Sequence, residues 1–233
     1  MLSNYLAALL AAPQPSSPYD PRLHDRVLEL GAGTGVVGIV LAKLLLDQRR
    51  RHLHLHDGRA PDDEQQTSTA RPSVIEVTDL ASMVPLMQAN SELNKVDSLV
   101  LARELAWGER LPPDLIDHDG DPERFEEGAR KWRRRPSLIL VADAVYLETL
   151  FPLLLATLLD LTTPDAEHQQ QPPLVLFCYQ KRRRADMRFF KMAKKHFVFE
   201  EVVEDPNKDT YKGKKPLYLY RMVRKSPAAA LQR

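Results

Sequence analysis

Short apolar segments alternate with longer segments of helical periodicity along most of the chain. Short runs rich in Val, Ile, Leu and Phe are typical of β-strands. Residues 137–141 (SLILV) are nearly all apolar, which indicates a strand buried on both faces. We expect strands at residues 26–30, 74–77, 98–102, 137–141, 174–179, 197–203 and 217–223.

Apolar positions with helical spacing lie between most of these strands. They predict an N-terminal helix that ends at Pro13 and further helices at residues 36–46, 80–94, 147–161 and 185–195. Alternating strands and helices are typical of a parallel sheet covered by helices on both faces. The last two strands have no helix between them, so we expect an antiparallel hairpin at one edge. The pattern predicts an α/β fold with a doubly wound, mostly parallel sheet of seven strands.

Two polar segments interrupt this alternation. Residues 49–73 contain two prolines and a DDEQQTST tract, and residues 117–136 are first acidic and then basic. Neither segment has an apolar period that could build its own core. A chain of 233 residues fits one large domain. We therefore expect a single domain, residues 1–233, with polar insertions at about 49–73 and 117–136.

Composition excludes several classes of protein. Hydrophobic residues make up 43% and charged residues 28%, which excludes a fully disordered chain. No apolar run approaches the roughly 18 residues of a membrane-spanning helix. The single cysteine, Cys178, excludes a disulfide-stapled secreted scaffold. The apolar run at residues 6–12 is short for a signal peptide and no basic residue precedes it, so we expect a cytoplasmic protein.

Charge is unevenly spread although the net charge is only +1. Residues 1–180 hold 17 Lys and Arg against 26 Asp and Glu, and residues 181–233 hold 16 against 6. A solvated basic face and a surface that steers an acidic macromolecule both explain such an excess. Aromatic residues near the basic runs have helix or strand spacing and are interpreted as core: Phe189, Phe190, Phe197 and Phe199.

A glycine-rich turn, ELGAGTGVVG at residues 29–38, follows the first predicted strand and opens a helix. Glycines let the backbone turn tightly and approach a ligand, and the helix start offers free N–H donors. Residues 33–38 match the GxGxxG of dinucleotide-binding proteins. The longer pattern ExGxGxG is similar to motif I of class I S-adenosylmethionine (SAM) methyltransferases. Both interpretations require a ligand at this turn.

Three further motifs lie at the ends of later strands. Asp79 ends the second strand, where a carboxylate accepts hydrogen bonds from ribose hydroxyls in both classes. Its long separation from Gly31 is explained by the insertion at 49–73. Residues 104–108 (ELAWG) follow the third strand and residues 141–146 (VADAVY) end the fourth. Because ligands bind beyond the carboxyl ends of the strands, we expect all these motifs to meet in one crevice.

The combination of motifs resembles one family. Motif I, the TDL at residues 78–80, a helix carrying Asn90 and Asn94, then L-x-W-G and D-x-x-Y are similar to the seven-strand protein-lysine methyltransferases called methyltransferase family 16. The similarity runs from about residue 3 to 223 and is greatest to the fungal elongation-factor enzymes, especially those acting on elongation factor 1-alpha. It implies a Rossmann-like fold, SAM as cofactor and protein-lysine N-methylation. It further implies a protein substrate. We expect a monomer with no membrane partner, and nucleic acid is disfavoured.

The resemblance also implies roles for particular residues. It places Asp79 on the ribose, Trp107 beside the adenine, and Asp143 and Tyr146 facing the incoming lysine. A core tryptophan is the alternative for Trp107, and a helix N-cap is the alternative for Asp143. The remaining predicted contacts to the cofactor are Glu29, Gly31, Ala32, Gly33 and Ala142.

Methyl transfer to lysine needs a neutral amine, whereas free lysine has a pKa of about 10.4. Burial and the sulfonium charge both lower the pKa of the amine, and we expect Asp143 mainly to orient it. No metal is needed. His52, His54 and His56 would share one face of an extended segment, but a structural zinc normally has four ligands, so a solvated polar loop is favoured.

Three other functions stay open. The basic C-terminal segment is compatible with methylation of RNA or a small molecule, although ADAVY lacks the N/D-P-P-Y motif of many nucleic-acid amine methylases. A dehydrogenase is disfavoured because no substrate domain or catalytic dyad is recognisable. Residues 1–6 already resemble the first helix of the family, so we expect the upstream hairpin and tryptophan to be missing. An inactive SAM-fold binding module lacking that substrate rim is therefore an alternative.

Overall fold

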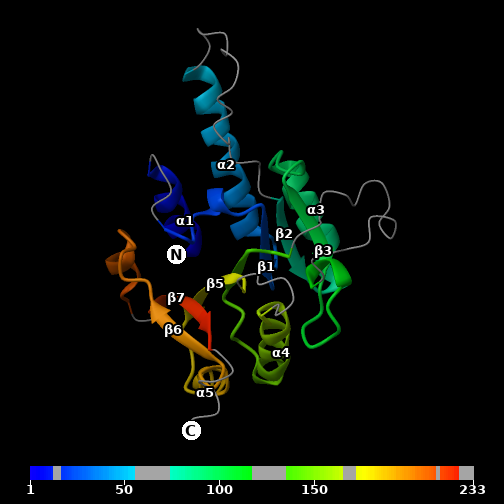
Figure 1. Ribbon diagram of the computed structural model, residues 1–233, viewed down its shortest axis with the longest axis vertical. Helices are drawn as coiled ribbons and strands as arrows, with labels where there is room; N and C mark the ends of the chain where they lie inside the picture. Colours follow the sequence, from blue (N-terminus) through cyan, green and yellow to red (C-terminus); the bar gives the residue numbers. More distant parts are fainter. Residues whose placement is uncertain (13–16, 56–73, 117–134, 165–171, 214–215, 226–233) are drawn as a thin grey trace.

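A twisted sheet forms the centre of the computed structural model, with helices on both sides (Figure 1). The structure describes residues 1–12, 17–55, 74–116, 135–164, 172–213 and 216–225. Within these residues the sheet has seven strands in the order β3-β2-β1-β4-β5-β7-β6. The strands are β1 (Arg26–Leu30), β2 (Val74–Asp79), β3 (Val100–Glu104), β4 (Leu138–Ala142), β5 (Leu174–Gln180), β6 (Phe197–Glu201) and β7 (Leu217–Arg224).

The strand order confirms the predicted doubly wound sheet. Strands β1 to β5 are parallel, while β7 runs antiparallel to both β5 and β6. The chain leaves β1 toward β2 and β3, and then returns to place β4 on the other side of β1. This reversal of direction between β1 and β4 is the point where open α/β sheets bind ligands, at the carboxyl ends of the strands.

Helices cover both faces of the sheet, as predicted. Side chains alternate along a strand, so Val27 of β1 packs on one side and Leu28 on the other, and each belongs to a separate core cluster. The helices are α1 (Leu2–Ala11), α2 (Val36–Leu55), α3 (Val84–Leu93), α4 (Phe151–Leu161) and α5 (Met187–Ala193). The first three supply the Val27 cluster and the last two the Leu28 cluster. In the part of the chain that the structure describes, no helix is long and apolar enough to span a membrane.

Helix α2 is longer than the apolar pattern predicts. It continues from residue 46 to Leu55 and projects beyond the sheet (Figure 1). Gln48 and the three arginines after it favour helix, and no glycine or proline stops the helix in this stretch. The first part of the predicted insertion at 49–73 is therefore helical. Residues 56–73 and 117–134 lie outside the described residues.

The helical backbone of residues 51–55 changes the interpretation of the histidines. The prediction that three alternating histidines share one face required an extended segment. The backbone at His52 and His54 is helical, so this requirement is not met there. His56 lies outside the described residues.

The predicted aromatic core is confirmed. Phe189, Phe190 and Phe197 are buried, and Phe199 is half-buried against the same cluster. The ring of Phe189 stacks on Phe177 of β5 with centroids 5.5 Å apart. These rings join α5 to the antiparallel edge of the sheet.

A buried ion network on the α4 side ties the first three strands together. Glu76 of β2 is fully buried and accepts hydrogen bonds from Arg26 of β1 at 2.5 Å and from Arg103 of β3 at 3.2 Å. Asp114 accepts from the same two arginines at 2.7 Å. Burial would raise the pKa of Asp114, but these bonds outweigh it and the pKa is lowered. None of the four residues was predicted from the sequence, because their pairing depends on strand order.

Candidate active site

The glycine-rich turn joins the end of β1 to the start of α2. Gly31, Gly33 and Gly35 have φ angles of +65°, +57° and +79°, which are left-handed conformations that favour glycine. The Ala32 N–H donates to the carbonyl of Thr78 at 2.9 Å, so the turn is fixed to the end of β2. The structure therefore brings the first and second predicted motifs together.

Asp79 closes this arrangement from the end of β2. Its Oδ2 accepts a hydrogen bond from the Gly33 N–H and its Oδ1 from the Leu80 N–H, both at 2.8 Å. Each carboxylate oxygen keeps a further lone pair for a ligand hydroxyl. A Cβ atom added at Gly33 would meet no atom within 4 Å, so the turn is open at this point. Free acceptors beside an open glycine turn fit the ribose and amino-acid parts of SAM.

Helix α3 also supports the turn. The side-chain amide of Asn90 donates to the carbonyl of Thr34 at 2.9 Å. Asn90 belongs to the motif that the resemblance singled out, and the structure shows what it does. It fastens the middle of the turn to a neighbouring helix.

Glu29 lies behind the turn and not in its opening. It is 2% exposed, and its Oε2 accepts a hydrogen bond from the Gly38 N–H in the first turn of α2 at 2.8 Å. Burial raises the pKa of Glu29 to about 8, with the Gly38 bond opposing and the charge of Asp79 reinforcing the shift. A Cβ atom at Gly38 would lie 2.4 Å from Val77, so α2 begins in close contact with β2. The observed contact of Glu29 is thus to the helix that frames the turn.

This buried carboxyl makes stability depend on pH. The pKa of Glu29 rises from 4.5 to about 8 on folding, so the folded state keeps a proton that the unfolded state releases within this window. The free energy of unfolding therefore falls as pH rises through the window. Glu29→Gln keeps an acceptor for Gly38 and has no charge to bury. Urea unfolding measures the free energy of unfolding of Glu29→Gln and of wild type at each pH. We expect the advantage of Glu29→Gln over wild type to be on the order of 2–4 kcal/mol larger near pH 8 than near pH 5. A difference that is the same at both pH values would contradict this.

Trp107 lies directly against the turn. A Cβ atom added at Gly31 would come within 2.6 Å of Cζ2 of the indole ring. The next residue, Gly108, has a φ of +80° and donates its N–H to the buried Thr157 hydroxyl at 2.8 Å. Trp107 packs against the Leu28 cluster as a core residue does. Part of its side chain remains exposed to solvent. The structure brings the L-x-W-G motif to the turn as predicted.

The D-x-x-Y motif follows β4, the strand next to β1. Ala142 ends the strand, and Asp143 follows with a φ of +61° and donates its N–H to the carbonyl of Cys178 at 2.9 Å. Asp143 does not cap a helix, since α4 begins only at Phe151 after a single 3₁₀ turn; the N-cap alternative is wrong. The side chains of Asp143 and Tyr146 are both exposed.

Two arginines that the sequence analysis did not assign to the site contact this motif. Arg182 pairs with Asp143 through both guanidinium Nη atoms, with Nη1 2.5 Å from Oδ1. The hydrogen bond to Asp143 raises the pKa of Arg182. Arg183 donates to the carbonyl of Tyr146. The signal in the sequence was the run KRRR directly after the fifth strand, which places these charges at the carboxyl edge.

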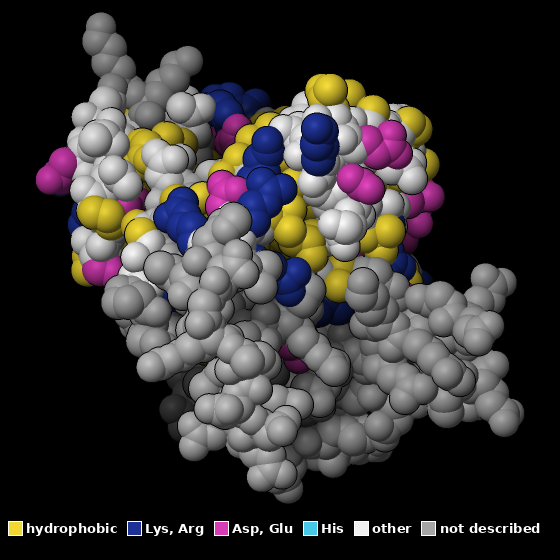
Figure 2. All heavy atoms as spheres, turned by 90° about the horizontal axis from the view of Figure 1, so that it is seen from above, with side chains coloured by type: hydrophobic (Ala, Val, Ile, Leu, Met, Phe, Trp, Pro, Cys, Tyr) yellow, Lys and Arg dark blue, Asp and Glu magenta, His cyan; other side chains and the backbone are white. Residues whose placement is uncertain are grey.

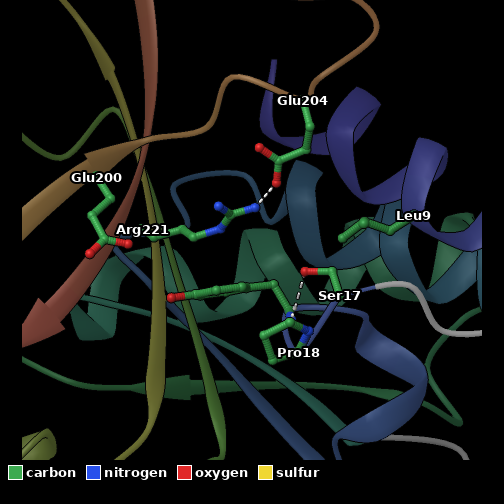
Figure 3. A pocket seen from close by; sticks show the side chains of 7 residues that line it. Leu9, Ser17, Pro18, Glu200, Glu204 and Arg221 are labelled. Carbon is green, nitrogen blue, oxygen red and sulfur yellow. Dashed lines mark hydrogen bonds and ion pairs between the residues drawn. The ribbon is translucent and has the colours of Figure 1, made fainter.

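A cavity of about 380 Å³ lies away from the predicted residues, between the end of α1 and strands β6 and β7 (Figure 3). Arg221 extends from β7 into it, pairs with Glu204 and lies over the Tyr19 ring at 5.3 Å. Glu204 also accepts a hydrogen bond from Tyr5 at 3.2 Å. These interactions join α1 to β7 and to the segment that follows β6. None of the predicted site residues lines this cavity. Its walls are Leu9, Ser17, Pro18, Tyr19, Glu200, Glu204 and Arg221.

The face seen from above does not present a surface of one charge. Figure 2 shows Lys and Arg side chains lying beside Asp and Glu side chains there. A continuous basic patch is the electrostatic footprint of a nucleic-acid-binding protein. On this face, among the described residues, basic and acidic groups are interleaved.

The fold and the turn define a class of protein. A glycine-rich turn after β1, a carboxylate at the end of β2 and a sheet whose seventh strand is antiparallel together characterise a class I methyltransferase that uses SAM. The chain belongs to the lysine methyltransferase family, whose sequence model matches residues 1–121 and 125–196.

Individual relatives agree with this assignment. The chain is 38% identical over 200 residues to the protein-lysine N-methyltransferase EFM6 of Saccharomyces cerevisiae, covering 86% of this chain and 67% of that protein. It is 30% identical over 202 residues to the protein N-lysine methyltransferase METTL21A of Danio rerio, covering 85% and 66%. The chain thus spans about two thirds of the length of these relatives. The crystal structure of mitomycin 7-O-methyltransferase MmcR is similar in fold, with a TM-score of 0.50 and 11% identity over 96% of this chain and 53% of that one.

Proposed function

We propose that this chain transfers a methyl group from SAM to a lysine side chain of a protein, and that elongation factor 1-alpha is its substrate. The observation that carries the proposal is the position of Asp143 and Tyr146. They follow β4, which pairs with β1 so that Val141 lies opposite Leu30, one residue before the glycine turn. An exposed carboxylate and phenol therefore lie beside the cofactor turn. The similarity to fungal elongation-factor lysine methyltransferases supports the choice of substrate.

Some residues around the turn bind the cofactor, and others face the acceptor lysine. Asp79 accepts hydrogen bonds from the ribose, Trp107 flanks the adenine, and the backbone of Ala142 contacts the cofactor. Asp143 and Tyr146 face the lysine. The methionine part of the cofactor lies along Gly31, Ala32 and Gly33, with Glu29 supporting them from behind.

The bound cofactor supplies a methyl group on a positively charged sulfur. The protein's own residues bring the acceptor amine onto the line of the sulfur–methyl bond, where positioning is worth several orders of magnitude in rate. Asp143 accepts a hydrogen bond from the amine and fixes its direction. The oxygen lone pairs that Arg182 leaves free are available for this, because the Asp143 side chain is 49% exposed.

The proposed unit of function is the whole chain acting as one domain. Helix α1 and strand β7 are far apart in sequence but pack together, since Arg221 donates to the Tyr5 hydroxyl at 3.4 Å. Both therefore contribute to one core. We further propose that the domain acts as a cytoplasmic monomer.

The experiment is a methyl-transfer assay with radiolabelled SAM and elongation factor 1-alpha made in bacteria. We expect wild type to label the factor on lysine, as located by mass spectrometry. Asp143→Ala should reduce the transfer rate by about 100-fold or more, because orientation of the amine is lost. Its affinity for SAM, measured by calorimetry, should change by less than about twofold, since Asp143 lies on the acceptor side. Transfer to RNA or to a small molecule instead, or SAM binding with no transfer at all, would contradict the proposal.

A further inference from the structure

The pair between Arg182 and Asp143 lies where the acceptor lysine is proposed to bind. The guanidinium contacts both carboxylate oxygens, which is the strongest geometry available to this pair of side chains. Both partners remain partly accessible, Arg182 at 34% and Asp143 at 49%. An arriving amine can thus reach Asp143 without first displacing Arg182.

A buried carboxylate holds the loop that carries Arg182. Asp186 is fully buried and accepts hydrogen bonds from the N–H groups of Arg183 at 3.0 Å and Arg182 at 3.4 Å. It also accepts from the hydroxyl of Tyr179 at 3.3 Å and pairs with the Arg183 side chain at 3.2 Å. Burial and the charge of Asp186 raise the pKa of Tyr179 to about 12, so the phenol remains a donor. Arg182 is therefore presented to Asp143 from a fixed support.

The charge of this pair matters for the reaction. Lysine attacks as a neutral amine, and a nearby carboxylate stabilises the ammonium form and raises the pKa of the amine. A guanidinium beside the same carboxylate opposes that effect. Asp143 paired with Arg182 can accept a hydrogen bond from the amine without strongly favouring its protonated form.

We propose that Arg182 is a positioning residue that holds Asp143 in place and compensates its negative charge, so that the bound lysine loses its proton to solvent water more readily. The inference rests on the proposed function and adds to it a group for setting the protonation state of the acceptor.

Other charged and titratable groups surround the pair, and all of them must be considered in a pH profile. Burial raises the pKa of the Cys178 thiol, and burial and Asp186 raise the pKa of Tyr179 to about 12. The remaining groups are present in wild type and variants alike, so a difference between profiles reports on the altered residue. Those groups are the amino group of Met1 beside Cys178, the Tyr146 phenol, Arg183, Asp186, and the pair that Arg188 of α5 forms with Glu148 before α4.

The test is the pH dependence of single-turnover methyl transfer to elongation factor 1-alpha with both substrates saturating. In Arg182→Gln we expect the acidic limb of the profile to move to higher pH by about 0.5–1 unit, because an uncompensated carboxylate then faces the amine. The rate on the acidic limb changes about tenfold per pH unit, so this shift should lower the rate near pH 7 by roughly three- to tenfold. Arg182→Lys keeps the charge but not the two-point contact, so its limb should stay near that of wild type while its rate falls.

Arg184→Gln is the matched control, since Arg184 is an exposed arginine in the same loop. It removes an equal charge and should leave the profile unchanged. All variants should bind SAM with the wild-type affinity, which also shows that they are folded. If Arg182→Gln is slower but the acidic limb of its pH profile does not move, Arg182 has only a structural role and the inference is overturned. An unchanged rate in Arg182→Gln would also overturn it. Wild type that binds SAM but transfers no methyl group would instead refute the proposed function, a result distinct from both.

Discussion

Asp79→Ala is expected to weaken SAM binding by at least about 100-fold, which corresponds to about 2.7 kcal/mol. Two losses add up in this variant. The ribose loses a charged acceptor, an interaction worth roughly 1.5–3 kcal/mol. The Gly33 N–H also loses its partner at 2.8 Å, so the turn is no longer held to the end of β2. Titration calorimetry with SAM measures the change directly.

The control for this variant is Asp47→Ala. Asp47 is an exposed carboxylate on α2, so its removal changes the net charge equally without touching the turn. SAM affinity should remain at the wild-type value. Equal affinities of wild type and Asp79→Ala would show that the ribose does not bind at Asp79. Folded wild type that fails to bind SAM would contradict the assignment of the whole cofactor site.

Glu76→Leu is expected to lower the free energy of unfolding by about 3–5 kcal/mol. An intact buried ion network contributes little net stability, because desolvation of the charges offsets their attraction. Removing one member is different. Arg26, which is 3% exposed, and Arg103 would then share one carboxylate, Asp114, in place of the two that they share in wild type. The uncompensated charge, and not the lost contact, dominates the effect.

Urea denaturation near neutral pH measures this loss. Glu76→Gln keeps the shape and one acceptor oxygen, so it should lose less than Glu76→Leu. Glu92→Gln changes an exposed carboxyl on α3 and should stay within about 0.5 kcal/mol of wild type. A Glu76→Leu protein as stable as wild type would mean that water or a rearranged side chain compensates the arginines.

The strands were predictable because burial on both faces leaves a strong local signal. In β1 and β4 nearly every position is buried, and the sequence of β4, LILVA, is a continuous apolar run. Helix ends were less predictable. Helix α2 runs past its apolar stretch because polar residues such as Arg50 also favour helix, and α4 begins late because Pro152 suits a first turn.

The cofactor side of the site was also visible in the sequence. Glycines at Gly31 and Gly33 are needed for left-handed turns, and Asp79 ends its strand, the place where a ribose-binding carboxylate is expected in folds of this type. These requirements depend on neighbours in the chain, so a linear pattern records them. The role of Glu29 was not evident, because only packing of α2 against β1 shows that it contacts Gly38.

The sequence by itself determined the class of fold, the glycine turn and the carboxylate that serves it, because each is specified by residues within a few positions of one another. Only the tertiary structure decided which charges meet. The pairs Arg182–Asp143 and Arg26–Glu76 join residues 39 and 50 positions apart, and nothing in the local pattern selects one arginine from several. Strand order and register place those side chains within hydrogen-bonding distance, and burial then makes the choice of partner energetically important.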